Sequence, residues 1–334
     1  MRARRRFLAG SAAVAASTLL LGRRRAYAGD AEITLKLAVV APPGTPWARH
    51  IRWLTTRVMD GTGGRVVIKP HLGGALGDEV STLSRCRQGG VEMWAGSVVA
   101  CASAVPEIAA LELPYLFPTL AAADDILDNR VTGEIESMMT KAGLKLLFFS
   151  ENGYRSIGTN FGFVHAVADL KGKRVRAQPG DVPTHTWRAM GASPLSIPET
   201  EALTALQTGV VDGFANTPLF AYAASWLQAA THVTLTRHSY QPALVVMNLD
   251  TWQALPKTAQ ALIRGDPKQQ ARLGRKIVRG VNKQVLDVIP AIGVELHEST
   301  SSELAAFKAA CEPTHKQFTD KHGDSFYKAI TKHL

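Results

Sequence analysis

The sequence has little that would support metal or disulfide chemistry. Its 334 residues include only three cysteines, Cys86, Cys101 and Cys311, which are too few and too scattered for a disulfide framework or a zinc ribbon. We interpret them as small buried apolar residues; in an oxidising compartment one pair of them could also be bridged, and the sequence does not choose a pair. The ten histidines form no HExxH motif and no paired spacing. We therefore expect no metal site and no cofactor.

Motifs of hydrolases and nucleotide-binding proteins are also missing. The segment HLGGALGD (71–78) has glycines but no GK[ST], so it predicts a tight strand-to-helix turn rather than a phosphate cradle. An exported hydrolase would have to use Ser97, Cys101 or Ser103 as its nucleophile. No GxSxG motif, histidine or paired carboxylate stands near them in a recognisable pattern. A hydrolase is therefore the least favoured function.

A long apolar run is found only at the start of the chain. Residues 1–28 combine a basic start, an apolar stretch and a small-residue end, which is typical of an export signal, here cleaved after Ala28. The apolar part is too short and too rich in small residues to span a bilayer. Its basic residues favour the twin-arginine route to the periplasm: Arg4 and Arg5 precede Phe7 and Leu8, and Arg23, Arg24 and Arg25 follow the apolar part.

The mature chain has little excess charge. Seven of the 38 lysines and arginines lie in residues 1–28, which hold no acidic residue, so the remaining 306 residues carry 31 basic and 28 acidic side chains. This balance of +3 does not indicate a nucleic-acid partner. No later apolar run approaches the roughly 18 residues of a membrane span. The length allows roughly two domains of ordinary size.

Short apolar strands alternate with helical patterns along the mature chain. This alternation is typical of a three-layer α/β fold. A long stretch of helical spacing follows from 258 to 289, in which Pro267 predicts a break or kink. The first predicted elements are the strand ITLKLAVVA (33–41), a helix over 46–59, the strand RVVIKP (65–70) and a helix over 78–88.

One segment is repeated at an offset of 120 residues. RQGGVEMWAGS (87–97) and QTGVVDGFANT (207–217) align without a gap, and each copy predicts a helix end, a glycine cap and the start of a strand. The repeat is either chance similarity between two turns or the sign of two similar lobes that face each other. Open α/β sheets bind ligands beyond the carboxyl ends of their strands, so the second interpretation puts Trp94, Phe214 and Asn216 at a shared crevice.

Seven segments, spread over nearly all of the mature chain, are highly specific in their order and spacing. They are PPGTPWARH (42–50), TGGRVVIKPHLGGALGDE (62–79), LELPYLFPT (111–119), ENGYRSIGTN (151–160), DLKGKRVRAQ (169–178), MGASPLSIPETEALTALQTGVVDGFAN (190–216) and PALVVMNLDTW (242–252). Through them the chain resembles the solute-binding proteins of TRAP (tripartite ATP-independent periplasmic) transporters, in the branch named for C4-dicarboxylate binding. The resemblance implies a two-lobed periplasmic binding protein with a hinged cleft, which passes an organic acid to a membrane permease.

The resemblance also implies three ligand-binding residues. The main carboxylate-binding arginine of the family matches Arg176, the arginine of its NG-aromatic-R motif matches Arg155, and its asparagine after the VDG turn matches Asn216. A guanidinium group presents a planar fork that pairs with both oxygens of a carboxylate and stays charged when it is desolvated. Arg174 lies two residues before Arg176 and is the alternative on the same strand, but the resemblance favours Arg176.

Two departures from the family pattern bear on the solute. Relatives commonly read VRVP and QENP where this chain reads VRAQ (175–178) and FANTP (214–218). Trp94 and Phe214 make the predicted cleft more apolar than one built for a small dicarboxylate. We therefore expect a monocarboxylate with a hydrophobic or aromatic body that lies between these two rings.

Two further points stay open at the level of sequence. Tyr240, in HSYQP (238–242), either stacks on the ligand or closes the second crossover between the lobes. A sensory module that binds a solute and signals to a membrane receptor would have the same cleft, so it is the alternative to a transport function.

We expect two α/β lobes joined by strand crossovers near residues 150 and 240. Lobe one comprises residues 29–152 and 241–280, and lobe two comprises residues 153–240 and 281–334. With two or more crossings the hinge can bend without unfolding either core. A ligand that touches both lobes then favours the closed state.

Overall fold

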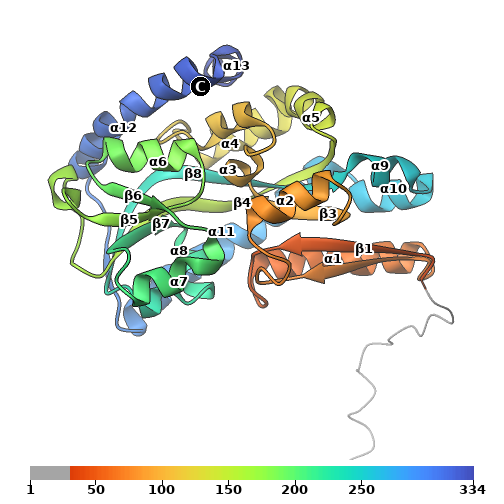
Figure 1. The fold of residues 1–334 in the computed structure, drawn as a ribbon, viewed down its shortest axis with the longest axis horizontal. Helices are drawn as coiled ribbons and strands as arrows, with labels where there is room; N and C mark the ends of the chain where they lie inside the picture. Colours follow the sequence, from red (N-terminus) through yellow and green to blue (C-terminus); the bar gives the residue numbers. More distant parts are fainter. Residues whose placement is uncertain (1–30) are drawn as a thin grey trace, which may run out of the picture.

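A computed structural model describes residues 31–334, and the predicted export signal over residues 1–28 lies outside them (Figure 1). The described strands form one mixed sheet of nine. They are β1 (Ile33–Val39), β2 (Val66–His71), β3 (Met93–Ser97), β4 (Leu144–Thr159), β5 (Arg174–Ala177), β6 (Ser193–Ser196), β7 (Gly213–Asn216), β8 (His232–Asn248) and β9 (Glu295–His297).

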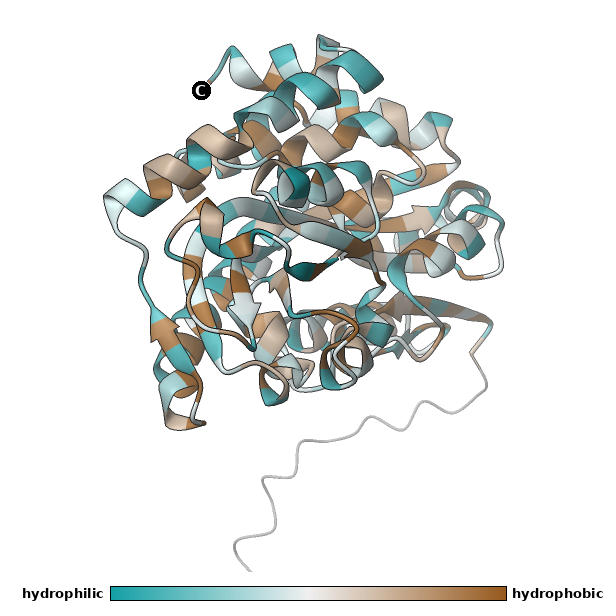
Figure 2. Cartoon of the chain, turned by 60° about the vertical axis from the view of Figure 1, so that its left-hand side comes forward, coloured by the Kyte–Doolittle hydropathy of each residue, from teal (hydrophilic) through white to brown (hydrophobic). Residues whose placement is uncertain are grey.

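Helices cover both faces of this sheet. The α-helices of the described chain are α1 (Pro46–Gly61), α2 (Glu79–Arg87), α3 (Val98–Cys101), α4 (Leu120–Asp125), α5 (Thr132–Lys141), α6 (Asp181–Ala189), α7 (Glu199–Gln207), α8 (Pro218–Ala223), α9 (Leu249–Ala254), α10 (Lys257–Arg264), α11 (Pro267–Ala291), α12 (Ser301–His322) and α13 (Ser325–Thr331). In Figure 2 teal and brown alternate along the outer helices, as expected for helices that bury one side.

Local sequence signals set several helix starts. The Thr45 side chain caps α1 by accepting from the backbone N–H of Ala48, and Pro46 follows at the first helical position, where its missing N–H has no cost. Asp266 caps α11 and Pro267 is its first residue. The predicted break at Pro267 is therefore confirmed, because this proline starts α11 after α10 has ended.

Two long strands run through the middle of the sheet and join its halves. β4 and β8 are antiparallel from the pair Leu144↔Asn248 to the pair Thr159↔His232, with three register shifts between them. On one side β8 is followed by β3, β1 and β2; on the other side β4 is followed by β7, β5 and β6. β1 pairs in parallel with β2 and β3, and β5 does so with β6 and β7, so the two halves have matching strand patterns.

The core divides into clusters on the two faces of each half-sheet. Trp94 of β3 belongs to one cluster of lobe one, and its neighbours Met93 and Ala95 belong to the cluster on the other face. Phe214 and Ala215 of β7 are divided between two clusters of lobe two in the same way. Alternate residues thus bury opposite faces, which confirms the predicted three-layer α/β class.

Helices from the end of the chain connect the two halves. α11 places Ala271 in the Trp94 cluster of lobe one and Val278 and Val285 in the Phe214 cluster of lobe two. Phe318 of α12 and Phe326 of α13 pack with the Trp94 cluster, although we assigned residues 281–334 to lobe two. The lobe boundaries stay a prediction, and we keep the names lobe one and lobe two for the residue ranges given above.

The repeat at an offset of 120 residues corresponds to equivalent backbone structure. Each copy ends a helix, α2 or α7, and Gly89 and Gly209 then have φ of 77° and 68°, in the left-handed region that glycine adopts without strain. Each copy continues into a strand, β3 or β7. Beyond the strands, Ser97 and Thr217 cap the short helices α3 and α8 in the same way. The interpretation as two similar lobes is supported.

The three cysteines are buried and unbridged in the described structure: Cys86 and Cys101 in lobe one, and Cys311 on α12. Burial raises the pKa of the Cys86 and Cys311 thiols to about 12. The interpretation as small buried apolar residues is confirmed. Between residues 31 and 334, none of the helices has the length and hydrophobicity that a membrane crossing requires.

Candidate functional site

Arg176 lies on β5, in the interior of lobe two. Its side chain is 0 % exposed. Its Nε donates to the carbonyl oxygen of Ile197 at 2.7 Å, and its Nη2 donates to Oε1 of Glu199 at 2.8 Å. Its Nη1 has no hydrogen-bond partner in the described part of the chain. Arg174 is different, because it is half exposed and pairs with Asp212 at 2.8 Å. Of the two arginines on β5, only Arg176 keeps an unpaired buried nitrogen.

One aromatic ring lies against the Arg176 guanidinium, and a second ring packs on the first. Phe214 lies directly opposite Arg176 in the parallel pairing of β5 with β7, so both side chains leave the sheet on the same face. The Arg176 guanidinium carbon lies 5.0 Å from the ring centroid of Trp226, and that ring meets Phe214 edge to face at 5.2 Å. The site therefore combines a buried charge with two aromatic rings, an arrangement that stabilises the cation.

Arg155 lies on β4, where the two halves of the sheet meet. Its Nε and Nη2 donate to Oε2 of Glu112 at 3.3 and 3.1 Å, and Nη2 also donates to Oε1 of Gln178. Glu112 ends the 3-10 helix Pro106–Glu112, and its other oxygen accepts from the backbone N–H of Val99 at 2.7 Å. Arg155 and Glu112 are both buried. Their ion pair links lobe two to lobe one.

Gln178 is the residue that bridges the lobes most extensively. Its Nε2 donates to Oε2 of Glu79 at 2.9 Å and to Oγ of Ser97 at 2.8 Å, both in lobe one. Its Oε1 accepts from Arg155 and, at 3.3 Å, from Nε2 of Gln241. Both ends of this buried amide are thus satisfied. Gln178 is the last residue of VRAQ (175–178), where relatives commonly read VRVP, so this departure from the family pattern supplies the bridge.

Three carboxyl groups belong to this region: Glu79 and Glu112 are buried, and Glu199 is partly buried. Burial raises the pKa of Glu79 to about 8, and the negative charge of Glu199 adds to the shift. Burial also raises the pKa of Glu112, although Arg155 opposes this shift. Burial lowers the pKa of Arg176, and Glu199 counteracts it. Both arginines therefore already have carboxylate partners, and Glu79 is a further acid that burial holds partly protonated near neutral pH.

The other predicted site residues have different surroundings. Asn216 ends β7 and is 5 % exposed, and its Oδ1 accepts from the backbone N–H of Thr217 at 2.8 Å. The hydroxyl of Tyr240 donates to Oε2 of Glu151 at 2.8 Å, and its ring meets Tyr154 edge to face. Tyr240 thus packs where β4 and β8 cross. Ligand contacts of either residue stay a prediction.

Trp94 and Phe214 are packed within separate lobes. Trp94 is 0 % exposed, its Nε1 donates to the carbonyl oxygen of Glu79 at 3.0 Å, and its ring lies where a Cβ at Gly96 would be. Phe214 is 2 % exposed and its ring covers Gly158 in the same manner. Equivalent glycines thus make room for equivalent rings. These contacts favour a packing role for Trp94; the predicted stacking of both rings on one ligand stays untested.

The site is closed in the described structure. The cavity lined by Arg155, Glu112, Gln178 and His238 measures about 20 Å³, room for about one water molecule. Burial and the Arg155 charge lower the pKa of His238 to about 3, so this histidine adds no positive charge there. The lobes also touch at Gly180 and Val99. The described structure therefore leaves no room for a solute beside Arg155.

Sequence reasoning identified the arginines but missed the groups that surround them. In the sequence Gln178 is only a departure from the family pattern, with no role assigned to it. Glu79, Glu112 and Glu199 come from three distant segments, and acidic residues at helix ends are usually solvent-exposed. Trp226 carried no signal in the sequence.

The family model described as bacterial extracellular solute-binding protein, family 7, matches residues 37–322. Among curated proteins, the 2,3-diketo-L-gulonate-binding periplasmic protein of Escherichia coli is 28 % identical over 236 residues, which are 70 % of this chain and 72 % of that protein.

Solved structures share the two-lobed fold. A TRAP periplasmic solute-binding protein from Bradyrhizobium sp., solved in complex with α/β-D-galacturonate, is 29 % identical with a TM-score of 0.84 and covers 90 % of this chain and 99 % of its own. A TRAP periplasmic solute-binding protein from Sulfurospirillum deleyianum, solved with bound succinate, is 25 % identical with a TM-score of 0.86 and covers 91 % of this chain and 100 % of its own.

Proposed function

Because the chain belongs to family 7 of the bacterial extracellular solute-binding proteins, we propose that it captures an organic acid in the periplasm and delivers it to the permease of a TRAP transporter. It acts by binding and release rather than by catalysis. Export by a twin-arginine signal is part of the proposal and rests on residues 1–28 alone. Neither a sensory role nor hydrolysis has a specific observation in its favour.

The buried state of Arg176 is the observation that carries this proposal. A guanidinium at 0 % exposure, with Nη1 unpaired, offers a desolvated donor to one carboxylate oxygen. Arg155 and Asn216 lie on the neighbouring strands β4 and β7. When the lobes open, these three groups are the natural anchor for the acid group of a solute.

The charges of the site favour an acid with a single carboxylate. Arg155 is paired with Glu112 and Arg176 with Glu199, so neither arginine brings an uncompensated positive charge. A dicarboxylate would add two negative charges to a buried region that also contains Glu79. Without a matching cation this is costly in a low-dielectric interior. We therefore propose a monocarboxylate.

The body of the solute is the finer part of the proposal. Trp226 lies against the Arg176 guanidinium and Phe214 packs on Trp226, so the two rings form an apolar wall. FANT also has Phe214 and Ala215 where QENP has a glutamine and a glutamate. A hydrophobic or aromatic body beside the carboxylate fits this wall. Galacturonate and 2,3-diketo-L-gulonate, named for two relatives, also have one carboxylate each but a polar body.

A thermal-shift screen of the mature protein tests the proposal. The panel contains succinate and malate as dicarboxylates, galacturonate as a sugar acid, and branched and aryl monocarboxylates. A ligand that binds only the folded state raises the melting temperature, by about 2.7 kcal/mol of added stability at a hundred times its Kd. We expect a shift with monocarboxylates alone. No shift with any acid would contradict the carboxylate-binding function, and a shift with dicarboxylates only would contradict the monocarboxylate.

A further inference from the structure

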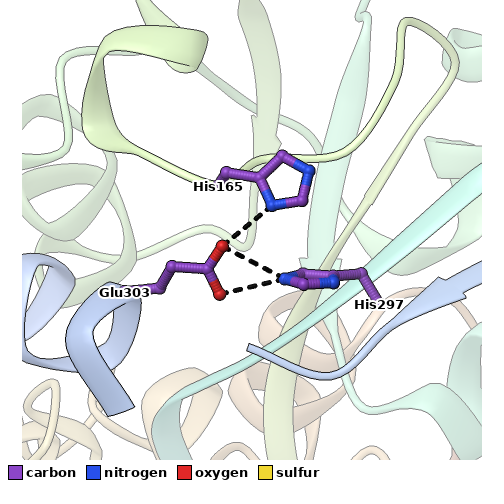
Figure 3. A group of neighbouring side chains, drawn as sticks. All are labelled: His165, His297 and Glu303. Carbon is purple, nitrogen blue, oxygen red and sulfur yellow. Dashed lines mark hydrogen bonds and ion pairs between the residues drawn. The ribbon is translucent and has the colours of Figure 1, made fainter. Parts of the chain in front are cut away.

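A second group of titratable side chains lies outside the candidate site, and Figure 3 shows it. His165 lies in the loop after β4, His297 is the last residue of β9, and Glu303 is in the first turn of α12. We call these three residues the HHE cluster. Sequence spacing could not reveal it, because 132 positions separate the two histidines.

The ligand atoms of the HHE cluster converge on one point. His165 Nδ1 lies 2.8 Å from Oε1 of Glu303, and His297 Nε2 lies 2.9 Å from Oε2 and 3.2 Å from Oε1 (Figure 3). All of these atoms lie within 4.8 Å of one another. Ligand atoms about 2.0 to 2.2 Å from a tetrahedral zinc ion are about 3.3 to 3.5 Å apart. The carboxylate oxygens would therefore move outward by a few tenths of an ångström from each histidine nitrogen, and the two nitrogens, at most 4.8 Å apart, would adjust around the ion.

Further contacts, from the backbone and from aromatic rings, hold the three side chains in place. Glu303 belongs to a capping box in which Oε2 accepts from the backbone N–H of Thr300 at 2.6 Å. The ring of Phe163 contacts His165 at 5.8 Å and His297 at 5.6 Å between centroids. The two imidazole rings meet edge to face at 4.4 Å. The cluster is thus oriented before any ion arrives.

We propose that His165, His297 and Glu303 bind one Zn²⁺ ion, with solvent as the fourth ligand. Two imidazole nitrogens and one carboxylate oxygen are a borderline donor set that suits Zn²⁺, whereas Ca²⁺ and Mg²⁺ prefer oxygen ligands alone. His165 is exposed and the other two are partly exposed, so the ion has an entry path and a free coordination position. Three protein ligands with an open position are a common zinc arrangement.

A bound ion would fasten three separate segments of lobe two. β9 pairs with β8, and three residues separate β9 from α12, which runs on to Phe318 in the lobe-one cluster. Through its three ligands the ion would connect the first turn of α12 to β9 and to the loop after β4. Binding would therefore stabilise the folded protein without occupying the solute site.

The test is a titration of the mature, tag-free protein with Zn²⁺ after treatment with a chelator. We expect one saturable site by calorimetry and a higher melting temperature, because the ion binds only the assembled cluster. Co²⁺ in place of Zn²⁺ should produce the visible absorption of a tetrahedral ion, and Mg²⁺ should produce no effect. Solute binding is measured in parallel, so a failure here is separate from a failure of the proposed function.

Glu303→Gln is the sharpest variant, because glutamine also completes a capping box but is a poor metal ligand. We expect Glu303→Gln and His297→Ala each to lower Zn²⁺ affinity by more than about tenfold. His333→Ala removes an exposed histidine near the end of the chain and should leave the affinity unchanged. Absence of a saturable site in the unaltered protein, or equal affinity in Glu303→Gln, would overturn the proposal.

Discussion

The two lobes have matching backbones but meet with unlike charges. Lobe one contributes two acids to their contact, Glu79 and Glu112. Lobe two contributes the base Arg155 and the amide of Gln178, while its second base, Arg176, pairs with Glu199 inside lobe two. Both lobes have two parallel strand pairs and a copy of the repeated segment. The chemistry therefore lies in side chains at the edges of equivalent strands and not in the fold of either lobe.

The hydroxyl residues after β3 and β7 show this difference at one position. Ser97 and Thr217 both cap a short helix, accepting from Ala100 and Phe220 respectively. The hydroxyl of Ser97 also donates to Glu79 at 2.7 Å and accepts from Gln178 at 2.8 Å, whereas Thr217 is fully buried within its own lobe. An equivalent backbone position thus carries a contact between the lobes in one copy only.

The largest change should come from removing the buried base of lobe two, Arg176. The proposed function makes Arg176 the partner of the ligand carboxylate, so for Arg176→Ala we expect calorimetry to show a loss of affinity of about thirty-fold to several thousand-fold. It also leaves Glu199 without its partner, so the melting temperature should fall as well.

Two variants separate these effects. Adding Glu199→Ala to Arg176→Ala removes the unpaired acid and should restore part of the stability but none of the affinity. Arg174→Ala, two residues earlier on the same strand, removes an exposed arginine and should leave binding unchanged. Near-native affinity in Arg176→Ala would show that Arg176 is not the anchor.

The next change sharpens the comparison by making lobe two more basic. Glu199→Gln keeps an acceptor for Nη2 of Arg176 but removes the negative charge that neutralises it. We expect carboxylates to bind about tenfold tighter, a gain of about 1.4 kcal/mol, while the ligand-free protein becomes less stable. Dicarboxylates should gain more than monocarboxylates.

Glu201→Gln is the matched control, because Glu201 lies on the same helix and is exposed. It should change neither affinity nor preference. If Glu199→Gln also leaves the affinities of the whole acid panel unchanged, the charge of Glu199 does not oppose the ligand, and the argument for a monocarboxylate fails.

A feature of the site could be predicted from the sequence only where its signal is a local pattern of residues. Strands, helix caps and the repeat depend on local patterns, so β1, α1 and the break at Pro267 could be predicted. Arg155 and Arg176 lie in recognisable motifs. The partners of the arginines could not be predicted, because Glu112 reaches Arg155 across 43 positions and Glu79 reaches Gln178 across 99. Such contacts depend on tertiary packing, which no local pattern encodes.

A smaller change concerns the apolar wall of lobe two. Phe214→Leu keeps apolar volume beside Arg176 but removes the ring that meets Trp226. If the body of the solute lies on this wall, aryl acids should lose several-fold in affinity relative to galacturonate, because an aromatic contact contributes about 0.5 to 1.5 kcal/mol. Ligand-induced changes in tryptophan fluorescence give an independent reading. Equal losses for every acid, with a lower melting temperature, would show that Phe214 serves only as core.

The last effect concerns Glu79, a buried acid of lobe one, and depends on pH. Burial raises the pKa of Glu79 from 4.5 to about 8, so between these values the folded protein holds a proton that the unfolded chain releases. Stability from this group is therefore fully present near pH 4.5 and is lost as the pH rises to about 8. We expect the melting temperature to fall between pH 5 and pH 8, because ionisation of this group over this range stabilises only the unfolded chain. Glu79→Gln cannot ionise, and its one amide oxygen keeps an acceptor for either the backbone N–H of Ser97 or Nε2 of Gln178, so its melting temperature should fall less over the same range. Glu201→Gln serves again as the control and should follow the unaltered protein. Identical pH profiles for the protein and Glu79→Gln would mean that Glu79 is ionised throughout, and that lobe one meets the arginines with its full negative charge.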